Sequence, residues 1–174
     1  MEKLNLVISA GIVLSHVAII FIVFAFLAKK ELKMFRFIGK YGANAAFLVA
    51  LSGMLISLYY SDIVGLEPCV LCWYQRIFMY PIVFILGLGI FKKDFSALTY
   101  SMLLSVIGGI IAIYHMSLQF GLSETQTCSI YSAVSCSNPY IQSFGYVTIP
   151  VMSFTGFVLI ILFSLLTQKY GKHE

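Results

Sequence analysis

The stretch 67–81, EPCVLCWYQRIFMYP, contains residues that can carry out redox chemistry. Cys69 and Cys72 form a C-x-x-C pair where a loop without basic residues meets a long apolar segment. Pro68 suits the first turn of a helix, and a helix beginning there places Cys69, Cys72 and Arg76 on one stripe. A helix N-terminus and a nearby cation both favour a thiolate over a thiol. The pattern therefore predicts a redox-active dithiol at a membrane surface.

The C-x-x-C spacing is also compatible with half of a zinc site or with a structural disulfide. A zinc site would combine this pair with Cys128 and Cys136, which form a C-x7-C pair. A c-type haem requires histidine directly after Cys72, where the chain has Trp73. A haem with two histidine ligands lacks a pair at one depth, because the three histidines are spread along the chain: His16, His115 and His173.

The composition is that of a membrane protein. The 174 residues are 60% hydrophobic and 10% charged, whereas an ordinary soluble domain is about 45–50% apolar and about 25% charged. A chain this apolar cannot bury its hydrophobic side chains in one water-soluble core. The net charge of +4 does not indicate nucleic-acid binding, because the basic residues lie in short clusters between apolar runs. We expect residues 1–174 to form a single integral membrane domain.

Five apolar segments are long enough to span, since about 20 helical residues cross about 30 Å of hydrocarbon. They cover approximately residues 6–28, 43–60, 73–91, 98–120 and 147–166. The first differs from a signal peptide, because its apolar stretch is too long, its leading region carries only Lys3, and no A-x-A site follows. We therefore predict an all-α membrane protein with five transmembrane helices.

The distribution of charge predicts the orientation of these helices. The connections after the first, third and fifth spans contain most of the basic residues: Lys29, Lys30, Lys33, Arg36, Lys40, Lys92, Lys93, Lys169 and Lys172. The loops after the second and fourth spans contain neither lysine nor arginine. By the positive-inside rule the basic connections are cytoplasmic. The N-terminus and both cysteine pairs are then expected on the extracytoplasmic side, a compartment that permits disulfides.

Two cysteine pairs on one membrane surface suggest an electron relay. Thiol–disulfide exchange moves two electrons between such pairs through a mixed disulfide. A membrane protein can pass these electrons to a lipid-soluble acceptor, and a quinone, such as menaquinone or ubiquinone, takes two electrons and two protons. Arg76, one turn beyond Cys72, is placed to hydrogen-bond a quinone carbonyl and to stabilise developing charge. An arginine that extends its charged end to the interface is an equally common use of this position.

These residues resemble a known family. PCVLCWYQR is similar to the signature of the DsbB/BdbC family of membrane thiol–quinone oxidoreductases, and its WYQR form looks more like the BdbC-type branch. The segment 115–119, HMSLQ, resembles the family's H-x-x-L-Q at the end of a span. The resemblance continues through the second cysteine pair and the segment 145–150, and covers about residues 43–166.

The resemblance implies a left-handed four-helix bundle that reoxidises a thioredoxin-fold thiol oxidase of the DsbA/BdbD type. By this analogy the partner attacks Cys128, and Cys136 passes the electrons to Cys69. Cys72 then faces the quinone. Arg76 matches the family's quinone-contacting arginine.

A further residue, His115, matches a histidine near the same pocket, where a satisfied interfacial histidine is the ordinary alternative. The chain departs from the family pattern in its additional first span and in the short C-x7-C spacing, which bears on the order of attack within Cys128 and Cys136.

Two other functions remain open on the sequence. One is a non-enzymatic membrane assembly factor or channel with two structural disulfides, although no span carries the polar stripe of a pore. The other is a relative of vitamin K epoxide reductase, a family that places its C-x-x-C in a late span, whereas here the pair opens the third. Bound quinone together with thiol-dependent quinone reduction would distinguish these functions.

Overall fold

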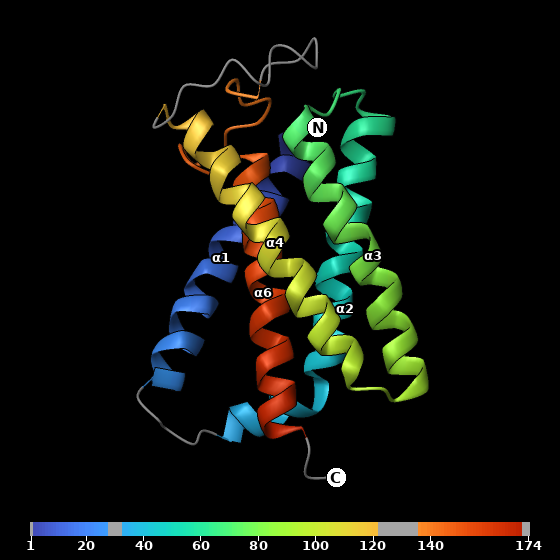
Figure 1. Cartoon of the computed structure of the whole chain (residues 1–174). Helices are drawn as coiled ribbons and strands as arrows, with labels where there is room; N and C mark the ends of the chain where they lie inside the picture. The colour runs from blue at the N-terminus through green and yellow to red at the C-terminus, as the bar shows by residue number, and fades with distance from the viewer. Residues whose placement is uncertain (1, 28–32, 122–135, 172–174) are drawn as a thin grey trace.

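The computed structural model describes residues 2–27, 33–121 and 136–171. The chain forms long helices that run up and down (Figure 1), with α1 at Glu2–Leu27 and α2 at Lys33–Leu58. Helix α2 continues into a short π-helix, η1, at Tyr59–Ile63. The remaining helices are α3 at Val70–Lys92, α4 at Ser96–Gln119 and α6 at Ile149–Tyr170.

Within the described part of the chain, five helices are long and apolar enough to cross a membrane. This confirms the expected all-α fold with five spans. Helix α2 begins earlier than the apolar run alone suggests, because the basic segment before residue 43 is also helical. Phe35 explains this extension: it is 1% exposed and packs in a cluster with Ile22, Ala25 and Leu166. Burial of one aromatic side chain thus fixes a segment whose charges suggested a loop.

Helix α6 packs most extensively against α2 and α4, and α3 packs against α4 and α2. The faces that α4 and α2 turn to their neighbours are rich in small residues, including Ser101, Ser105, Gly108, Ala112, Ala46 and Ala50. Small residues let membrane helices approach closely. At Gly108 the Phe157 ring of α6 occupies the space that a Cβ atom would need. These contacts hold α2, α3, α4 and α6 together as the four-helix bundle.

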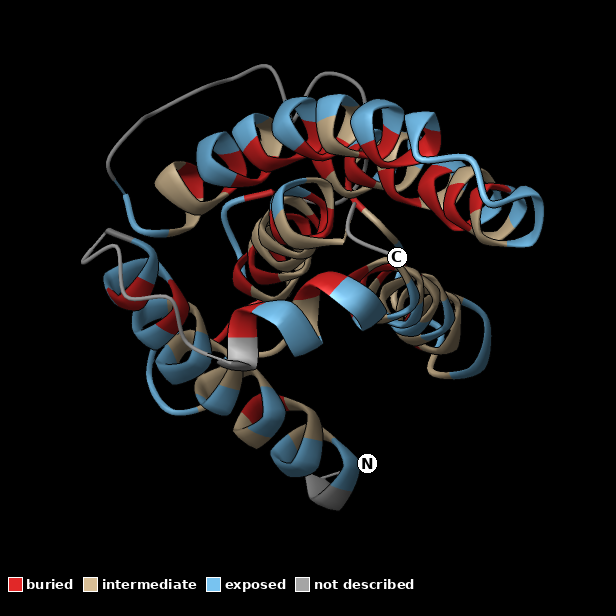
Figure 2. Ribbon diagram, turned by 90° about the horizontal axis from the view of Figure 1, so that it is seen from below, coloured by how far each residue is buried: buried red, intermediate tan, exposed pale blue. Residues whose placement is uncertain are grey.

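The outward faces of the helices are apolar, as the surface of a membrane protein requires. Figure 2 shows the buried residues turned toward neighbouring helices and the exposed ones turned outward. Exposed hydrophobic side chains occur on every span, for example Phe24, Leu48, Phe84, Ile110 and Leu165. Helix α1 is the most exposed span, with 11% of its apolar window buried. The chain is therefore a multi-pass membrane protein with α1 at the edge of the bundle.

The two ends of the bundle differ in chemistry. One end, here called the cysteine end, is formed by the start of α3, the end of α4 and the segment 136–148 before α6 (Figure 1). The opposite end, the basic end, contains the start of α2, the turn between α3 and α4, and the end of α6. The described basic residues of the predicted cytoplasmic connections all belong to elements at the basic end.

Candidate redox site

The candidate site lies at the cysteine end, where Cys69 precedes the first turn of α3. Helix α3 begins at Val70, and Cys69 is its N-cap residue in extended conformation, with φ −68° and ψ 168°. The expected helix start at Pro68 was therefore two residues early, and Cys69 does not continue the stripe of Cys72 and Arg76. Tertiary packing explains the difference, because Cys69 is 3% exposed and clusters with Leu118 and Cys136.

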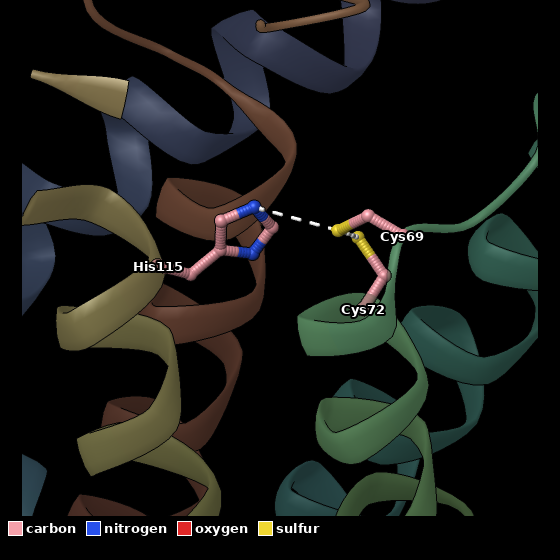
Figure 3. Close-up of side chains that lie close together, drawn as sticks. All are labelled: Cys69, Cys72 and His115. Atoms are coloured by element: carbon pink, nitrogen blue, oxygen red, sulfur yellow. Dashed lines mark hydrogen bonds between the residues drawn. The ribbon is translucent and has the colours of Figure 1, made fainter. Parts of the chain in front are cut away.

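Cys69 and Cys72 are free thiols in close contact. Their sulfur atoms lie 3.3 Å apart, and the Cys69 sulfur lies 3.7 Å from Nε2 of His115. Figure 3 shows the two cysteines at the start of α3 and His115 reaching toward them from α4. The N-cap position also directs the N-terminal end of the α3 dipole at the sulfur of Cys69. A negatively charged sulfur is stabilised in such a position.

His115 is held by polar partners on both ring nitrogens. The amide nitrogen of Gln75 lies 3.1 Å from His115 Nδ1, and His115 Nε2 lies 3.2 Å from the backbone oxygen of Cys136. An amide nitrogen donates and a carbonyl oxygen accepts, so Nδ1 is the acceptor and Nε2 carries the proton. That N–H also faces the sulfur of Cys69. His115, which is 1% exposed, thereby links α3 and α4 to the segment that contains Cys136.

This environment lowers the pKa of Cys69 from an ordinary 9.0 to about 4. The main cause is the hydrogen bond that the Cys72 thiol donates to the Cys69 sulfur. Burial opposes the shift, while the hydrogen bond from His115 adds to it. At neutral pH Cys69 is therefore a thiolate, the form of cysteine that acts as a nucleophile and as an electron donor.

A cavity of about 260 Å³ lies next to this thiol pair, among α1, α2, α3 and α6. Cys72, Gln75 and Arg76 line it from α3, and Thr155 lines it from α6. Most of the remaining lining is apolar, including Ile8, Ile12, Val49, Ile56, Met79, Met152 and Leu159. The additional helix α1 thus contributes one wall of the cavity, a role that no sequence motif indicated.

Arg76 lies in the wall of this cavity with a specific partner. Its Nη2 donates to the backbone oxygen of Ser57 at 3.1 Å, and its guanidinium carbon lies 5.3 Å from the centre of the Trp73 ring. Ser57 comes just before the π-helix η1, and π-helical turns inside α-helices are frequent at functional sites. The side chain therefore reaches across to α2, which differs from a free arginine extended toward an interface.

A second, much smaller cavity of about 20 Å³ also borders the thiol pair. It is lined by Cys69, His115 and Cys136, and Cys136 is disulfide-bonded. Cys72 lines both cavities, as do Tyr140 and Ile149. The C-x-x-C pair thus borders both the cavity that contains a disulfide-bonded cysteine, through Cys69 and Cys72, and the larger apolar cavity, through Cys72.

The structure brings together most of the residues that the sequence singled out. Cys69, Cys72, His115 and Cys136 meet at the small cavity, and Arg76 lines the large one. His115 lies beside the thiols and is not among the residues that line the large cavity. Its expected place near a quinone pocket stays a prediction. Cys128 lies outside the described residues.

Other residues of the site were missed by sequence reasoning: Gln75, Ser57, Tyr140, Thr155 and the α1 residues of the cavity. Gln75 alone had a signal, since it stands inside the CWYQR motif one turn from Cys72.

The thiols and the histidine also form a possible metal-binding group. The ligand atoms of Cys69, Cys72 and His115 all lie within 4.8 Å of one another. Structural zinc takes four ligands, and the disulfide-bonded Cys136 has no thiolate to offer as the fourth. This arrangement favours a redox dithiol over the zinc site built from both cysteine pairs.

A bundle of membrane-length helices that holds a thiolate, a partner thiol and a disulfide-bonded cysteine at one end defines a membrane thiol–disulfide oxidoreductase. Comparison with known proteins gives the family. The family model described as "Disulfide bond formation protein DsbB" matches residues 40–167, which is well over half of the chain. The chain belongs to the DsbB family, and its role is disulfide-bond formation in a membrane.

Several curated relatives are similar over most of their length. The chain is 44% identical to "Probable disulfide formation protein C 2" of Bacillus cereus over 72% of this chain and 89% of the relative. It is 47% identical to "Probable disulfide formation protein C" of Halalkalibacterium halodurans, over 70% and 88%. It is 45% identical to "Disulfide bond formation protein C" of Bacillus subtilis, over 71% and 90%. No solved structure matches significantly.

Proposed function

We propose that this protein is a thiol:quinone oxidoreductase that reoxidises a thioredoxin-fold thiol oxidase of the DsbA/BdbD type. The electrons leave the partner through Cys128 and Cys136, pass to Cys69 and Cys72, and end on a membrane quinone. Both cysteine pairs face the extracytoplasmic side of a bacterial cytoplasmic membrane, in keeping with the gathering of the described basic residues of the connections at the basic end.

One observation carries this proposal: Cys69 borders the small cavity together with the disulfide-bonded Cys136, and Cys72 borders both that cavity and the large apolar one. A structural disulfide needs no such cavity, and a zinc site needs no second cysteine pair in a disulfide. A relay needs both neighbours, because the pair must receive electrons on one side and release them on the other.

The cavity fits the head group of a quinone. Its volume of about 260 Å³ is close to the lower end of the roughly 300–1,000 Å³ that ligand pockets span. It therefore has room for a ring and the start of an isoprenoid tail. The apolar side chains of α1, α2 and α6 suit the ring and tail, while Gln75 and Arg76 supply hydrogen-bond donors. A quinone bound there would accept two electrons from the thiol pair.

The thiol steps follow from the positions of the cysteines. The reduced partner attacks Cys128, and its own disulfide forms as the Cys128–Cys136 bond is broken. The thiolate of Cys136 then attacks Cys69, which releases Cys72. Attack of Cys128 on Cys136 frees Cys69 and leaves the C-x-x-C pair with both electrons. The structure has the pair in this reduced form with Cys136 disulfide-bonded.

His115 supports the exchange by positioning and charge. Its Nε2–H contacts both the sulfur of Cys69 and the backbone oxygen of Cys136, so it holds the two exchange partners near each other. The N–H stabilises negative charge on Cys69 as that sulfur becomes a leaving group. Arg76 is fixed by Ser57 and Trp73 at the cavity wall, where its charge stabilises electron density that moves from Cys72 into the cavity.

The test is a reconstituted assay with the double variant Cys128→Ser/Cys136→Ser. In nanodiscs with short-chain menaquinone or ubiquinone, the variant should still reduce the quinone when a small dithiol is supplied. It should fail to oxidise a reduced thioredoxin-fold partner. The wild-type protein should do both, as followed by quinone absorbance and a non-reducing gel.

Two outcomes would contradict the proposal. Oxidation of the partner by the double variant would show that the second pair is not part of the relay. Loss of both activities together with a lowered melting temperature would support the structural-disulfide alternative, in which the protein is an assembly factor or channel.

A further inference from the structure

His16 is an ionisable residue inside a membrane span. It lies in the middle of α1, in an apolar segment, Leu4–Phe26, whose mean hydropathy is 2.7. Ionisable side chains inside membrane spans are energetically costly and typically mark sites where ions, protons or substrates move. The family model begins its match at residue 40, so His16 belongs to the part of the chain that the family does not cover.

Both ring nitrogens of His16 have partners on or next to α6. Nε2 lies 2.8 Å from Oγ1 of Thr155, and Nδ1 lies 3.2 Å from the hydroxyl oxygen of Tyr146. The Thr155 hydroxyl donates to the backbone oxygen of Val151 at 2.8 Å. Its oxygen therefore accepts from His16 Nε2–H, and Nδ1 accepts from the Tyr146 hydroxyl. Tyr146, His16 and Thr155 thus form one continuous hydrogen-bonded chain.

The two ends of this chain lie in different environments. Tyr146 is 40% exposed and belongs to the segment before α6 at the cysteine end. Thr155 is 1% exposed and lines the large cavity beside Cys72 and Arg76. The hydrogen bonds therefore connect the protein surface to the cavity through a residue of α1, the helix that lies outside the family match.

We propose that His16 conducts protons from the surface at Tyr146 to the large cavity at Thr155. These protons are consumed in the reduction of the quinone. This inference rests on the proposed function and adds a proton route to it.

The proton balance explains why a route is needed. Oxidation of the C-x-x-C pair releases two electrons, and formation of a quinol consumes two protons. Cys72 holds one proton as a thiol, but Cys69 has already lost its proton because its pKa lies at about 4. The second proton must therefore come from water. Arg76 cannot supply it, since a guanidinium does not deprotonate in proteins.

The transfer is balanced at each atom. The hydroxyl of Tyr146 gives a proton to His16 Nδ1 and regains one from water. His16 Nε2 gives its proton to Oγ1 of Thr155. The original Thr155 hydroxyl proton turns away from Val151 and leaves into the cavity. One proton enters and one leaves, and the imidazole is left with its proton on Nδ1. Rotation of the side chain then exchanges the places of the two nitrogens, so that Nδ1–H donates the next proton to Thr155 and Nε2 receives one from Tyr146, which restores the starting tautomer.

Other titratable groups also line the cavity, and they define the competing route: Tyr60, Glu67, Tyr80 and Tyr140. Glu67 is the strongest of these, because it is exposed and precedes the C-x-x-C pair. Among the described residues, Glu67 makes no side-chain hydrogen bond to another helix, whereas each ring nitrogen of His16 has a partner on or next to α6. A Glu67→Gln variant is accordingly the matched comparison for the test.

The test uses His16→Gln in nanodiscs with a short-chain menaquinone. Glutamine keeps a donor and an acceptor for holding α1 against α6 but cannot relay a proton. We expect kcat for quinone reduction to fall about 10²-fold, with a larger solvent isotope effect. The KM and the directly measured Kd of the quinone should stay within about two-fold, since binding contacts are retained. His173→Gln, a control, should leave both kcat and KM for the quinone unchanged.

A second measurement does not depend on turnover. Nitrogen-15 NMR of labelled histidine should show His16 with its proton on Nε2 and an accepting Nδ1, and Tyr146→Phe should shift only the Nδ1 signal. His16→Gln and the controls assign the signals of the three histidines.

The outcomes separate this proposal from the one before it. If the wild-type protein neither binds nor reduces the quinone, the proposed function is wrong, and so is the proton route through His16. If the wild-type protein is active and His16→Gln leaves kcat unchanged, or raises only KM, the proton route is wrong and His16 only positions α1. A greater loss in Glu67→Gln than in His16→Gln would likewise overturn it.

Discussion

Replacing Cys72 with alanine should raise the pKa of Cys69. The Cys72 thiol lies 3.3 Å from the Cys69 sulfur, and its hydrogen bond is the main cause of the lowered pKa. The background for this test is Cys128→Ser/Cys136→Ser, so that no exchange with the second pair occurs. Because alanine cannot donate, the thiolate loses its principal partner while the burial that opposes it remains.

The size of the change follows from the strength of the lost bond. A hydrogen bond to a charged group contributes about 1.5–3 kcal/mol, and about 1.4 kcal/mol corresponds to one pKa unit. The pKa of Cys69 should therefore rise by about one to two units from its starting value of about 4. The sign is fixed: in the variant, more of Cys69 is protonated in acidic solution, so its thiolate chemistry begins at higher pH.

The assay is the rate of iodoacetamide alkylation of Cys69 against pH, with the modified peptide quantified by mass spectrometry. The midpoint of the profile is compared, because the intrinsic nucleophilicity of a thiolate also changes with its pKa. Cys72→Ser is the matched control, since a hydroxyl still donates and should keep the midpoint near that of the thiol. His115→Phe should give a smaller rise, because His115 is a lesser cause than Cys72.

An unchanged midpoint in Cys72→Ala would refute the assignment of Cys72 as the donor. Equal midpoints in the alanine and serine variants, both raised, would show that the sulfur itself is needed and that hydrogen bonding does not explain the shift.

Three further results are expected. Arg76→Ala should lower the rate of quinone reduction by a factor of about 10²–10³ and leave thiol–disulfide exchange between the partner and the second cysteine pair nearly normal. Arg76→Lys should restore the rate only in part. Equal activity of the alanine variant at limiting quinone would show that Arg76 has no such role. Gly108→Ala should destabilise the bundle by about 1–3 kcal/mol, because the added Cβ would overlap the Phe157 ring. Gly109→Ala should be tolerated, since the nearest atom to a Cβ there is 3.9 Å away. Equal melting temperatures of the two variants would contradict this packing. After reduction, a membrane-impermeant thiol reagent added to intact cells should label all four cysteines. Labelling only after permeabilisation would contradict the proposed orientation.

The number of spans could be predicted from the sequence, as could the gathering of Cys69, Cys72 and Cys136 at one end of the bundle. The length of an apolar run identifies a span, and the positions of the positive charges distinguish the two ends of the bundle. The exact start of α3 could not be predicted in this way. Pro68 is compatible with a first helical turn, but burial of Cys69 against Leu118 and Cys136 sets the helix start. This contact joins residues far apart in the chain.

The detailed site depends on contacts between helices, and a pattern along one helix cannot reveal them. Gln75 lies in a recognisable motif, but its contact with His115 Nδ1 requires the packing of α3 against α4. The lining of the cavity by Ile8 and Ile12 could not be predicted either, because any apolar span contains such residues. His16 had a signal, as a histidine inside a span, but its partners only emerged from the fold.

The central claim is that Cys136 passes electrons directly to Cys69, and a two-cysteine variant tests it most directly. In Cys72→Ser/Cys128→Ser the remaining cysteines, Cys69 and Cys136, are both buried in one cluster and both contact His115. Mild oxidation in nanodiscs followed by non-reducing peptide mass spectrometry should yield one disulfide-linked peptide containing both residues. Two separately alkylated thiols after the same oxidation would contradict the relay.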